Sequence, residues 1–184
     1  MDGEKTCSTQ AYSPFHLRGR RVVVEAVIPA RVVASVFRTT PQAIVDGHLG
    51  AVSGRRLGGD VNDNIMLCNA LAAMFIACGQ DVACVIESSA GHVRMHTTDG
   101  GDLYTSLLAP NINVGTVGGG TRLPSAQACL DIVLRGADPS APGRAGELAE
   151  VFAACCLAGE LSCVAAGVTG DFSKAHQELR KSNL

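Results

Sequence analysis

The amino-acid sequence predicts an α+β fold, a mixed α/β arrangement built as one domain. Hydrophobic residues make up 47% of the 184 residues and charged residues 17%, which is the balance of a chain that buries a core. Runs rich in β-branched residues, typical of strands, occur beside Ala- and Leu-rich runs typical of helices. These runs do not follow a strict βαβ order, which favours α+β over a doubly wound parallel sheet.

The first half of the chain reads as a strand followed by helices. The run RRVVVEAVIP predicts a strand over Arg20–Pro29. One or two short helices are expected next, in PARVVASVFRTTPQAIVDGHLG, with Thr40 as an N-cap. A glycine-rich connection is expected over Val52–Val61. The apolar run after it predicts a buried helix over Asp63–Asp81, closed by Gly79.

The middle of the chain is expected to be rich in strands, and the last third helical. The segments DVACVIESS, HVRMHTT, DLYTSLLAP and NINVGTV read as strands, and Thr97–Asp102 reads as a hairpin turn between two of them. A helix is predicted from Pro124 to Leu134, a loop over Gly136–Arg144, and a long helix over Ala145–Val168. A polar tail ends the sequence.

Charge, cysteine content and the length of the apolar runs limit the kinds of function that the sequence allows. The formal net charge is −2 with no basic block, so no nucleic-acid partner is expected. The eight Cys form no CxxC pair and lie mostly among Ala and Leu, which indicates reduced thiols in a cytosol-like compartment. The opening residues are polar and unlike a signal peptide. The longest apolar stretches are interrupted by polar residues, so no membrane segment is expected.

The most unusual stretch is NVGTVGGGTRLPSAQACL, from Asn113 to Leu130, with four glycines between Gly115 and Gly120. A glycine-rich turn between a strand and a helix brings backbone N–H groups against a phosphate or a cofactor. The spacing is neither GxGxxG nor a P-loop. Two interpretations stay open: contact with a ligand, or a tight turn where two backbones or two subunits pack closely.

Several ionisable residues are candidates for a site or for structural roles. Asp81 ends an apolar run, so its carboxylate is paired, solvated or simply a polar helix terminus. Glu160 lies among small apolar residues and is expected to be hydrogen-bonded. His176 is either a proton donor that swings over a site or an exposed residue. His92 and His96 would share a strand face without a third ligand, so no metal site is expected.

Taken together and in order, EAVIPARVV, IACGQDVA, DLYTSLLAPNINVGTVGGGTRLPSAQACL and AGELSCVAAG resemble class I 3-hydroxy-3-methylglutaryl-coenzyme A reductase. The resemblance is to the C-terminal portion of the catalytic domain and runs from Arg18 onward. It implies part of the large domain, with a long central helix, an antiparallel-rich sheet and a C-terminal helix. Residues 1–17 would be a polar N-terminal segment, 18–170 the partial catalytic domain, and 171–184 a flexible C-terminal tail.

The resemblance also implies an activity. That family reduces 3-hydroxy-3-methylglutaryl-CoA to mevalonate with NADPH, in isoprenoid and sterol biosynthesis. Its members are dimers or tetramers with active sites at the subunit interface. The soluble chain would be cytoplasmic, whereas full-length eukaryotic relatives are attached to the endoplasmic reticulum membrane. The residues matching the cofactor loop are Gly115, Thr116, Val117, Gly118, Gly119, Gly120 and Thr121.

Four further residues match functional positions of the family. Asp81 matches the catalytic Asp, and His176 matches the His that protonates the departing coenzyme A thiolate. Asn69 matches an active-site Asn that binds substrate, and Ser182 resembles the phosphorylatable Ser of the eukaryotic tail.

The family's catalytic Lys, which stabilises an oxyanion, is less simply placed. An ungapped count puts Cys7 at its position, whereas a shift of two residues puts Lys5 there. The family's catalytic Glu and its small NADPH-holding domain have no counterpart in the 184 residues. A His of the family is Met66 here, and Arg55 and Arg56 stand where small residues are usual.

The chain alone is therefore expected not to be a competent reductase. Three interpretations follow. The chain is a C-terminal piece of the reductase whose missing half is encoded elsewhere or was lost, a diverged non-reductive homologue that binds an acyl-CoA or a partner and regulates or performs another reaction, or a structural or dimerisation module without catalysis.

Overall fold

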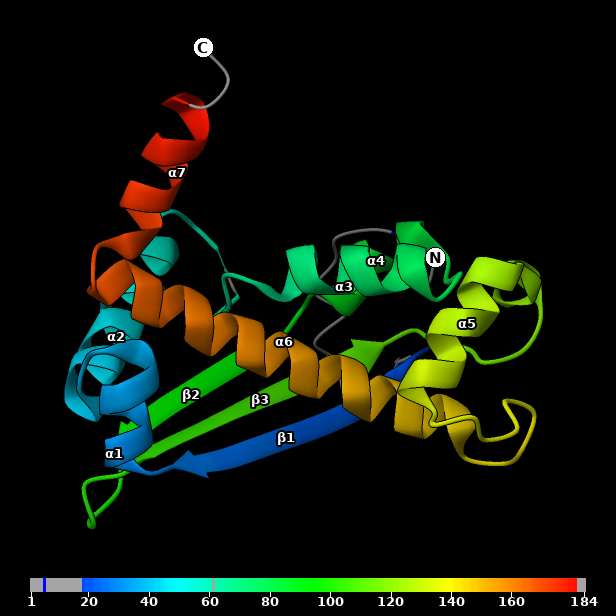
Figure 1. Ribbon diagram of the computed structural model, residues 1–184, viewed down its shortest axis with the longest axis horizontal. Helices are drawn as coiled ribbons and strands as arrows, with labels where there is room; N and C mark the ends of the chain where they lie inside the picture. The colour runs from blue at the N-terminus through cyan, green and yellow to red at the C-terminus, as the bar shows by residue number, and fades with distance from the viewer. Residues whose placement is uncertain (1–4, 6–17, 61, 182–184) are drawn as a thin grey trace.

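The computed structural model describes residues 5, 18–60 and 62–181. Its centre is an antiparallel sheet of three strands in the order β1-β3-β2, crossed by the long helix α6 (Figure 1). The predicted mixed α/β class, with a long helix, an antiparallel sheet and a C-terminal helix, is confirmed. The elements are β1 (Arg20–Ile28), α1 (Ala30–Val32), η2 (Val33–Phe37), α2 (Pro41–Leu57), α3 (Leu67–Ala77), η3 (Val82–Cys84), α4 (Val85–Ser88), β2 (His92–Thr97), β3 (Leu103–Ile112), η4 (Gly119–Arg122), α5 (Pro124–Val133), α6 (Arg144–Val168) and α7 (Asp171–Lys181).

The sheet is closed at one end by the predicted hairpin turn. The Thr98 N–H donates to Asp102 O at 2.8 Å, and the Gly101 N–H donates to Thr98 O at 2.9 Å. These bonds join β2 and β3, so the turn expected over Thr97–Asp102 is confirmed, as are the strands β1 and β2.

The central strand β3 differs from the prediction. It is one strand that runs through Pro110 and ends at Ile112, where two separate strands were expected. A proline lacks the N–H that a ladder needs, so it is tolerated in a sheet at a bulge or an edge. The register of β1 against β3 shifts between Arg20 and Val22, which is opposite Pro110. The bulge therefore accommodates the proline, and the predicted strand NINVGTV is wrong beyond Ile112.

The segment DVACVIESS was predicted as a strand, and this is wrong: it forms η3 and α4. The Asp81 carboxylate accepts a hydrogen bond from the Ala83 N–H at 3.1 Å and so caps the first turn. Glu87, on the following turn, is buried against Arg18. Capping and a tertiary ion pair outweigh the β-propensity of the valines and isoleucine.

The helix predicted over Asp63–Asp81 is shorter at its start, because α3 begins at Leu67. The backbone N–H groups of Ile65 and Met66 donate to the carboxylate of Glu160 on α6. That contact holds the residues before α3 out of the helix. At the other end Gly79 has φ +64°, so its predicted role as the closing residue is confirmed.

The glycine-rich connection predicted over Val52–Val61 is also wrong in its first part, because α2 continues to Leu57. The chain leaves the helix only at Gly58 and Gly59, and Gly59 has φ +83°. The helix begins as predicted: the Thr40 hydroxyl accepts a hydrogen bond from the Ala43 N–H at 3.2 Å.

The core lies between the sheet and the helices α2, α3 and α6, which pack on one another. Phe75 of α3 and Phe152 of α6 meet with ring centroids 5.9 Å apart. Within the described part of the chain, α6 alone is long and apolar enough to cross a membrane by length and composition. Its packing against β1, β3, α2 and α3 gives it the role of the central core helix.

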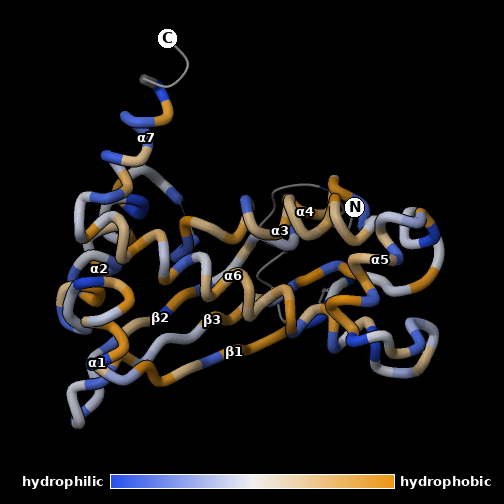
Figure 2. Tube along the Cα trace, in the orientation of Figure 1, coloured by the Kyte–Doolittle hydropathy of each residue, from blue (hydrophilic) through white to orange (hydrophobic). Residues whose placement is uncertain are grey.

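The end of the described chain is helical. Residues 171–181, which the sequence assigned to a flexible tail, form α7, and Figure 1 shows it projecting from the end of α6 that lies over α2. Figure 2 shows that α7 is mainly hydrophilic, in contrast to the strands. An ion pair between Arg38 and Asp171, with 2.5 Å between Nη2 and Oδ2, joins the base of α7 to the turn before α2.

Candidate active site

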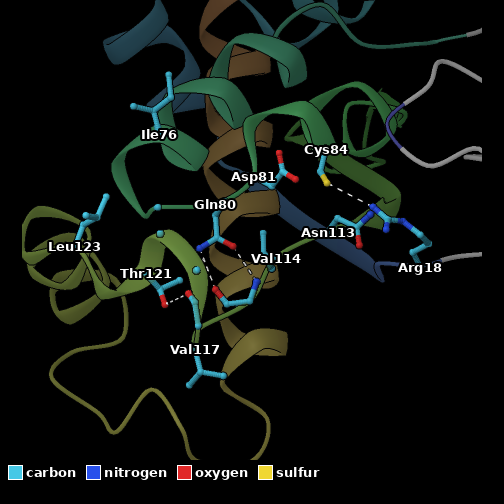
Figure 3. Close-up of a pocket in the computed structure, with 15 residues that line it drawn as sticks. Arg18, Ile76, Gln80, Asp81, Cys84, Asn113, Val114, Val117, Thr121 and Leu123 are labelled. Carbon is cyan, nitrogen blue, oxygen red and sulfur yellow. Dashed lines mark hydrogen bonds between the residues drawn. The ribbon is translucent and has the colours of Figure 1, made fainter.

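A cleft of about 620 Å³ opens where the end of α3 meets the loop between β3 and α5 (Figure 3). Gln80 and Asp81 line it from the α3 side, and the glycines of the Gly115–Gly120 loop line it from the other side. Two segments singled out from the sequence, the residues around Asp81 and the glycine-rich loop, therefore share one cavity.

The glycines of this loop have two distinct structural roles. Gly118 and Gly119 adopt φ +84° and +52°, which L side chains rarely adopt. Gly120 instead packs against Gly79: a Cβ on Gly120 would lie 2.6 Å from Gly79 O, and one on Gly79 would lie 2.3 Å from Gly120 O. Close backbone packing, one of the two interpretations of the motif, is thus present at Gly120.

The rest of the loop leaves backbone uncovered. A Cβ at Gly115, Gly118 or Gly119 would meet nothing within 4 Å. The main chain at these three glycines, all of which line the cleft, therefore has room for a ligand against it. The two interpretations of the glycines apply to different members of the same loop.

The two threonines of the loop are directed inward. Thr116 donates its hydroxyl to Pro139 O, and Thr121 donates to Gly118 O, each at 2.6 Å. Both side chains are buried, whereas Val117 between them is 63% exposed. The threonines hold the shape of the loop, and Val117 presents an apolar side chain at the cleft.

Asp81 lies at the rim with an exposed carboxylate. Lys5 places its Nζ 2.7 Å from Asp81 Oδ2. Hydrogen bonding from Lys5, followed by that from the Ala83 N–H, lowers the pKa of Asp81. The structure therefore brings Lys5, the residue given by the two-residue shift, to Asp81. Cys7, the position of the ungapped count, lies outside the described residues.

A second carboxylate lies behind this pair. Glu87 is 2% exposed, and its Oε1 is 2.6 Å from Arg18 Nη2. The backbone N–H of Lys5 also donates to Glu87 Oε1, at 3.4 Å. Burial raises the pKa of Glu87, but the hydrogen bonds from Arg18 and Lys5 outweigh burial and lower it overall. Glu87 is thus an ionised anchor for Arg18 and for the backbone of Lys5.

Sequence reasoning missed Glu87 and Gln80. Gln80 accepts from the Gly115 N–H at 2.8 Å and donates to Gly115 O at 2.9 Å. A charged residue inside the run VIESS was a usable signal for Glu87, but that run was read as a strand. Nothing local marks Gln80, because its partner lies 35 residues away.

Two other predicted residues are not brought to the cleft. Asn69 is exposed near the start of α3, with its Nδ2 4.0 Å from Met66 Sδ. His176 is exposed on α7 and packs edge-on against Phe172, with ring centroids 4.6 Å apart. Figure 1 places α7 at the end of α6 opposite α5. Ser182 lies outside the described residues.

The histidines of the sheet have other contacts. His92 Nδ1 lies 3.2 Å from Asp63 Oδ2, and Asp63 also accepts hydrogen bonds from Arg56. His96 stacks on Tyr104 with ring centroids 4.5 Å apart. Over residues 5, 18–60 and 62–181, no group of three or more His, Cys, Asp or Glu side chains is arranged to hold a metal ion.

Comparison with known proteins shows the family to which the chain belongs. The family model described as hydroxymethylglutaryl-coenzyme A reductase matches residues 3–181. The chain therefore belongs to the hydroxymethylglutaryl-coenzyme A reductase family.

Three relatives show how much of such a protein the chain represents. The 3-hydroxy-3-methylglutaryl-coenzyme A reductase of Aeropyrum pernix is 42% identical over 172 residues, covering 91% of this chain and 40% of that protein. Reductase 1 of Dictyostelium discoideum is 41% identical over 90% of this chain and 31% of its own length. The Pyrococcus horikoshii reductase is 39% identical over 88% of this chain and 40% of its own length. The chain thus spans less than half the length of these relatives.

Proposed function

We propose that this chain supplies part of the active site for NADPH-dependent reduction of 3-hydroxy-3-methylglutaryl-CoA to mevalonate. The observation that carries the proposal is the Asp81–Lys5 pair at the rim of the cleft that the glycine loop lines. Family membership adds the reaction class. The proposal that a nicotinamide cofactor lies against this loop is supported by Gly118 and Gly119, where a Cβ would meet nothing within 4 Å.

The reaction needs a positive charge where negative charge develops. When bound, NADPH would supply a hydride to the thioester carbonyl carbon, and the carbonyl oxygen would gain negative charge. We assign to Lys5 the stabilisation of that oxygen through its ammonium group. Asp81 keeps Lys5 charged and in place, because a carboxylate 2.7 Å away favours the protonated amine.

Release of the product requires a proton. Collapse of the first hydride adduct expels coenzyme A as a thiolate, which must be protonated to the thiol. A second hydride would then be needed to reduce the resulting aldehyde to the alcohol of mevalonate. We propose His176 as this donor, since an imidazole is suited to proton transfer near neutral pH. Its position on α7, away from the cleft, means that this role requires α7 to reach a site completed by another segment or another copy of the chain.

The remaining assignments follow from family membership. We propose that Asn69 contacts the substrate, that Ser182 is a phosphorylation site, and that the enzyme is a cytoplasmic homodimer or tetramer. Because the chain spans 40% or less of its relatives, we propose that the 184 residues alone do not complete the reaction.

A second candidate function is non-reductive binding of an acyl-CoA. Its support is Met66, which stands where the family carries a His on the helix before GQD. Met66 Sδ lies 3.6 Å from Cys163 Sγ, so this position is a sulfur contact between α6 and the start of α3. Arg55, which also motivated this candidate, is directed to Asn64 O and to Asp60 instead.

The test is thioester-dependent NADPH oxidation by the chain alone and by the chain mixed with the N-terminal half of the catalytic region of the Aeropyrum pernix relative. We expect activity only in the mixture. Activity of the chain alone would overturn its proposed incompleteness. Binding of a coenzyme A ester without activity in the mixture would favour the non-reductive function. A stable dimer that binds neither ligand would indicate a dimerisation module.

A further inference from the structure

Gln80 precedes Asp81 in the chain and bonds across the cleft wall to the glycine loop. Its side-chain amide donates to Cys78 O at 2.8 Å and to Gly115 O at 2.9 Å. Its carbonyl oxygen accepts from the Gly115 N–H at 2.8 Å. Both amide hydrogens and the oxygen are therefore used, and the Gln80–Gly115 pair is reciprocal (Figure 3).

The geometry at this position requires glutamine. Asparagine is one methylene shorter and does not span the same gap. Glutamate has no donor when ionised and would set a carboxylate against two carbonyl oxygens. Leucine has a similar volume but forms no hydrogen bond, so it would leave the Gly115 N–H without its side-chain partner.

A second contact holds the other end of the same loop. Gly79, the residue before Gln80, packs directly on Gly120, so close that neither position has room for a Cβ. Consecutive residues at the end of α3 thus hold the two ends of the loop, Gly115 through Gln80 and Gly120 through Gly79. Between these ends, Gly118 and Gly119 face open space.

We propose that Gln80 is a positioning residue that locks the glycine loop to the segment bearing Asp81, so that the cofactor-facing backbone and the Asp81–Lys5 pair form one rigid unit. This inference rests on the proposed function for its catalytic meaning. Preorganised groups stabilise a transition state without reorganising during the reaction, so a fixed spacing between loop and carboxylate favours hydride transfer.

Gln80 has the surroundings of a positioning residue. Its side chain is partly exposed and lines the cleft, and its partners are loop backbone atoms at the same cavity. The Asp81 carboxylate, by contrast, bonds to Lys5 and to the Ala83 N–H. The spacing between loop and carboxylate is therefore set through Gln80 and Gly79.

The experiment is amide hydrogen exchange of the 184-residue chain, resolved by residue with NMR, for the wild type, Gln80→Leu and Gln80→Glu. Gln42→Leu is the matched control, because Gln42 is an exposed glutamine on α2 outside the cleft. We expect Gly115 to exchange about tenfold faster in Gln80→Leu and to be unchanged in the control. Protection of Phe75 in the core reports whether each variant is folded.

Gln80→Glu gives a readout that a general loss of packing would not give. Once protonated, the carboxyl group donates one hydrogen bond to a loop carbonyl, so protection of Gly115 recovers as the pH falls, after correction for intrinsic exchange. Unchanged Gly115 exchange in folded Gln80→Leu, or exchange in Gln80→Glu without this pH dependence, would overturn the proposal.

Adding NADPH to the same proteins, each mixed with the N-terminal half of the catalytic region of the Aeropyrum pernix relative, separates this inference from the proposed function. We expect NADPH to shift the amide signals of the glycine loop in the wild type, with an affinity about tenfold lower in Gln80→Leu. If Gly115 exchanges faster in Gln80→Leu but NADPH shifts no amide signal in any protein, the positioning role of Gln80 is supported and the cofactor assignment is contradicted. Equal NADPH affinity in the wild type and Gln80→Leu supports the cofactor site and overturns the role of Gln80.

Discussion

Replacing Glu160 by alanine tests the internal support of the helix that carries Asp81 to the cleft. The Glu160 carboxylate, 1% exposed on α6, accepts the Met66 N–H at 2.8 Å and the Ile65 N–H at 2.9 Å. These donors lie just before α3, where a helix start leaves N–H groups unpaired. Each hydrogen bond to a charged acceptor contributes about 1.5–3 kcal/mol, so losing both predicts a cost of about 3–6 kcal/mol in the free energy of unfolding.

The assay is urea unfolding at neutral pH, followed by far-UV circular dichroism. Glu150→Ala is the control, because Glu150 is an exposed glutamate on the same helix; its cost is expected to stay within about 0.5 kcal/mol. A cost below about 1 kcal/mol for Glu160→Ala would refute the argument that this carboxylate supports the start of α3.

The pH dependence of the same contact provides a second check. Burial raises the pKa of Glu160 above its ordinary value of 4.5, and the hydrogen bonds from Ile65 and Met66 oppose this only in part. A carboxyl group with a raised folded pKa adds stability below its unfolded pKa and loses that contribution as the pH rises through the folded pKa. From pH 4.5 upward, the wild type should therefore lose stability relative to Glu160→Gln. A constant difference between the two proteins over this range would contradict the raised pKa.

Three further predictions concern the cleft and the tail. Gly120→Ala should destabilise the chain by about 1–3 kcal/mol, because the new Cβ would lie 2.6 Å from Gly79 O; an unchanged melting temperature would argue against this packing. Lys5→Met should raise the pKa of Asp81 in an NMR titration, since hydrogen bonding from Lys5 is the main cause of its lowering. Because the pKa of Asp81 is lowered in the folded chain, its carboxylate adds stability above the unfolded pKa, and this stability is lost as the pH falls through the folded pKa. Lys5→Met should therefore make the free energy of unfolding fall less steeply with acid. An Asp81 pKa that is unchanged in Lys5→Met would contradict the Lys5–Asp81 contact. In the complementing mixture, His176→Gln should slow thioester reduction more than reduction of the free aldehyde, which has no thiolate to protonate; equal slowing of both steps would reject the proton-donor role.

The elements that could be predicted from the sequence carry strong local signals. β1 is a β-branched run that ends at Pro29, and the β2–β3 hairpin has its turn at adjacent glycines. α5 begins at Pro124, and α6 follows a loop that ends at Gly143. At each of these places the local preference and the tertiary structure agree.

The errors occur where a distant residue decides the local structure. The start of α3 depends on Glu160, about 95 residues later, and α4 buries Glu87 against Arg18, 69 residues away. No window of sequence contains both partners of such a contact. Propensity alone therefore extended α3 and assigned a strand to the residues of α4.

The candidate site could be predicted only where its residues carry a local signal. Asp81 and the glycine loop are recognisable from residue type, spacing and family resemblance, and the structure places both at one cleft. The sequence allowed two positions, Lys5 and Cys7, for the family's catalytic Lys. Only the structure shows that Lys5 lies beside Asp81. Gln80 carries no local signal, since its role is defined by the backbone of Gly115.

The most direct test of the central claim, that the Asp81 and glycine-loop cleft is a reductase active site, is the effect of Asp81→Asn on thioester-dependent NADPH oxidation. The measurement uses the chain mixed with the N-terminal half of the catalytic region of the Aeropyrum pernix relative. Without the carboxylate beside Lys5, the rate should fall by about two to three orders of magnitude while the variant remains folded. A mixture that oxidises NADPH equally fast with Asp81 and with Asn at this position would contradict the assignment.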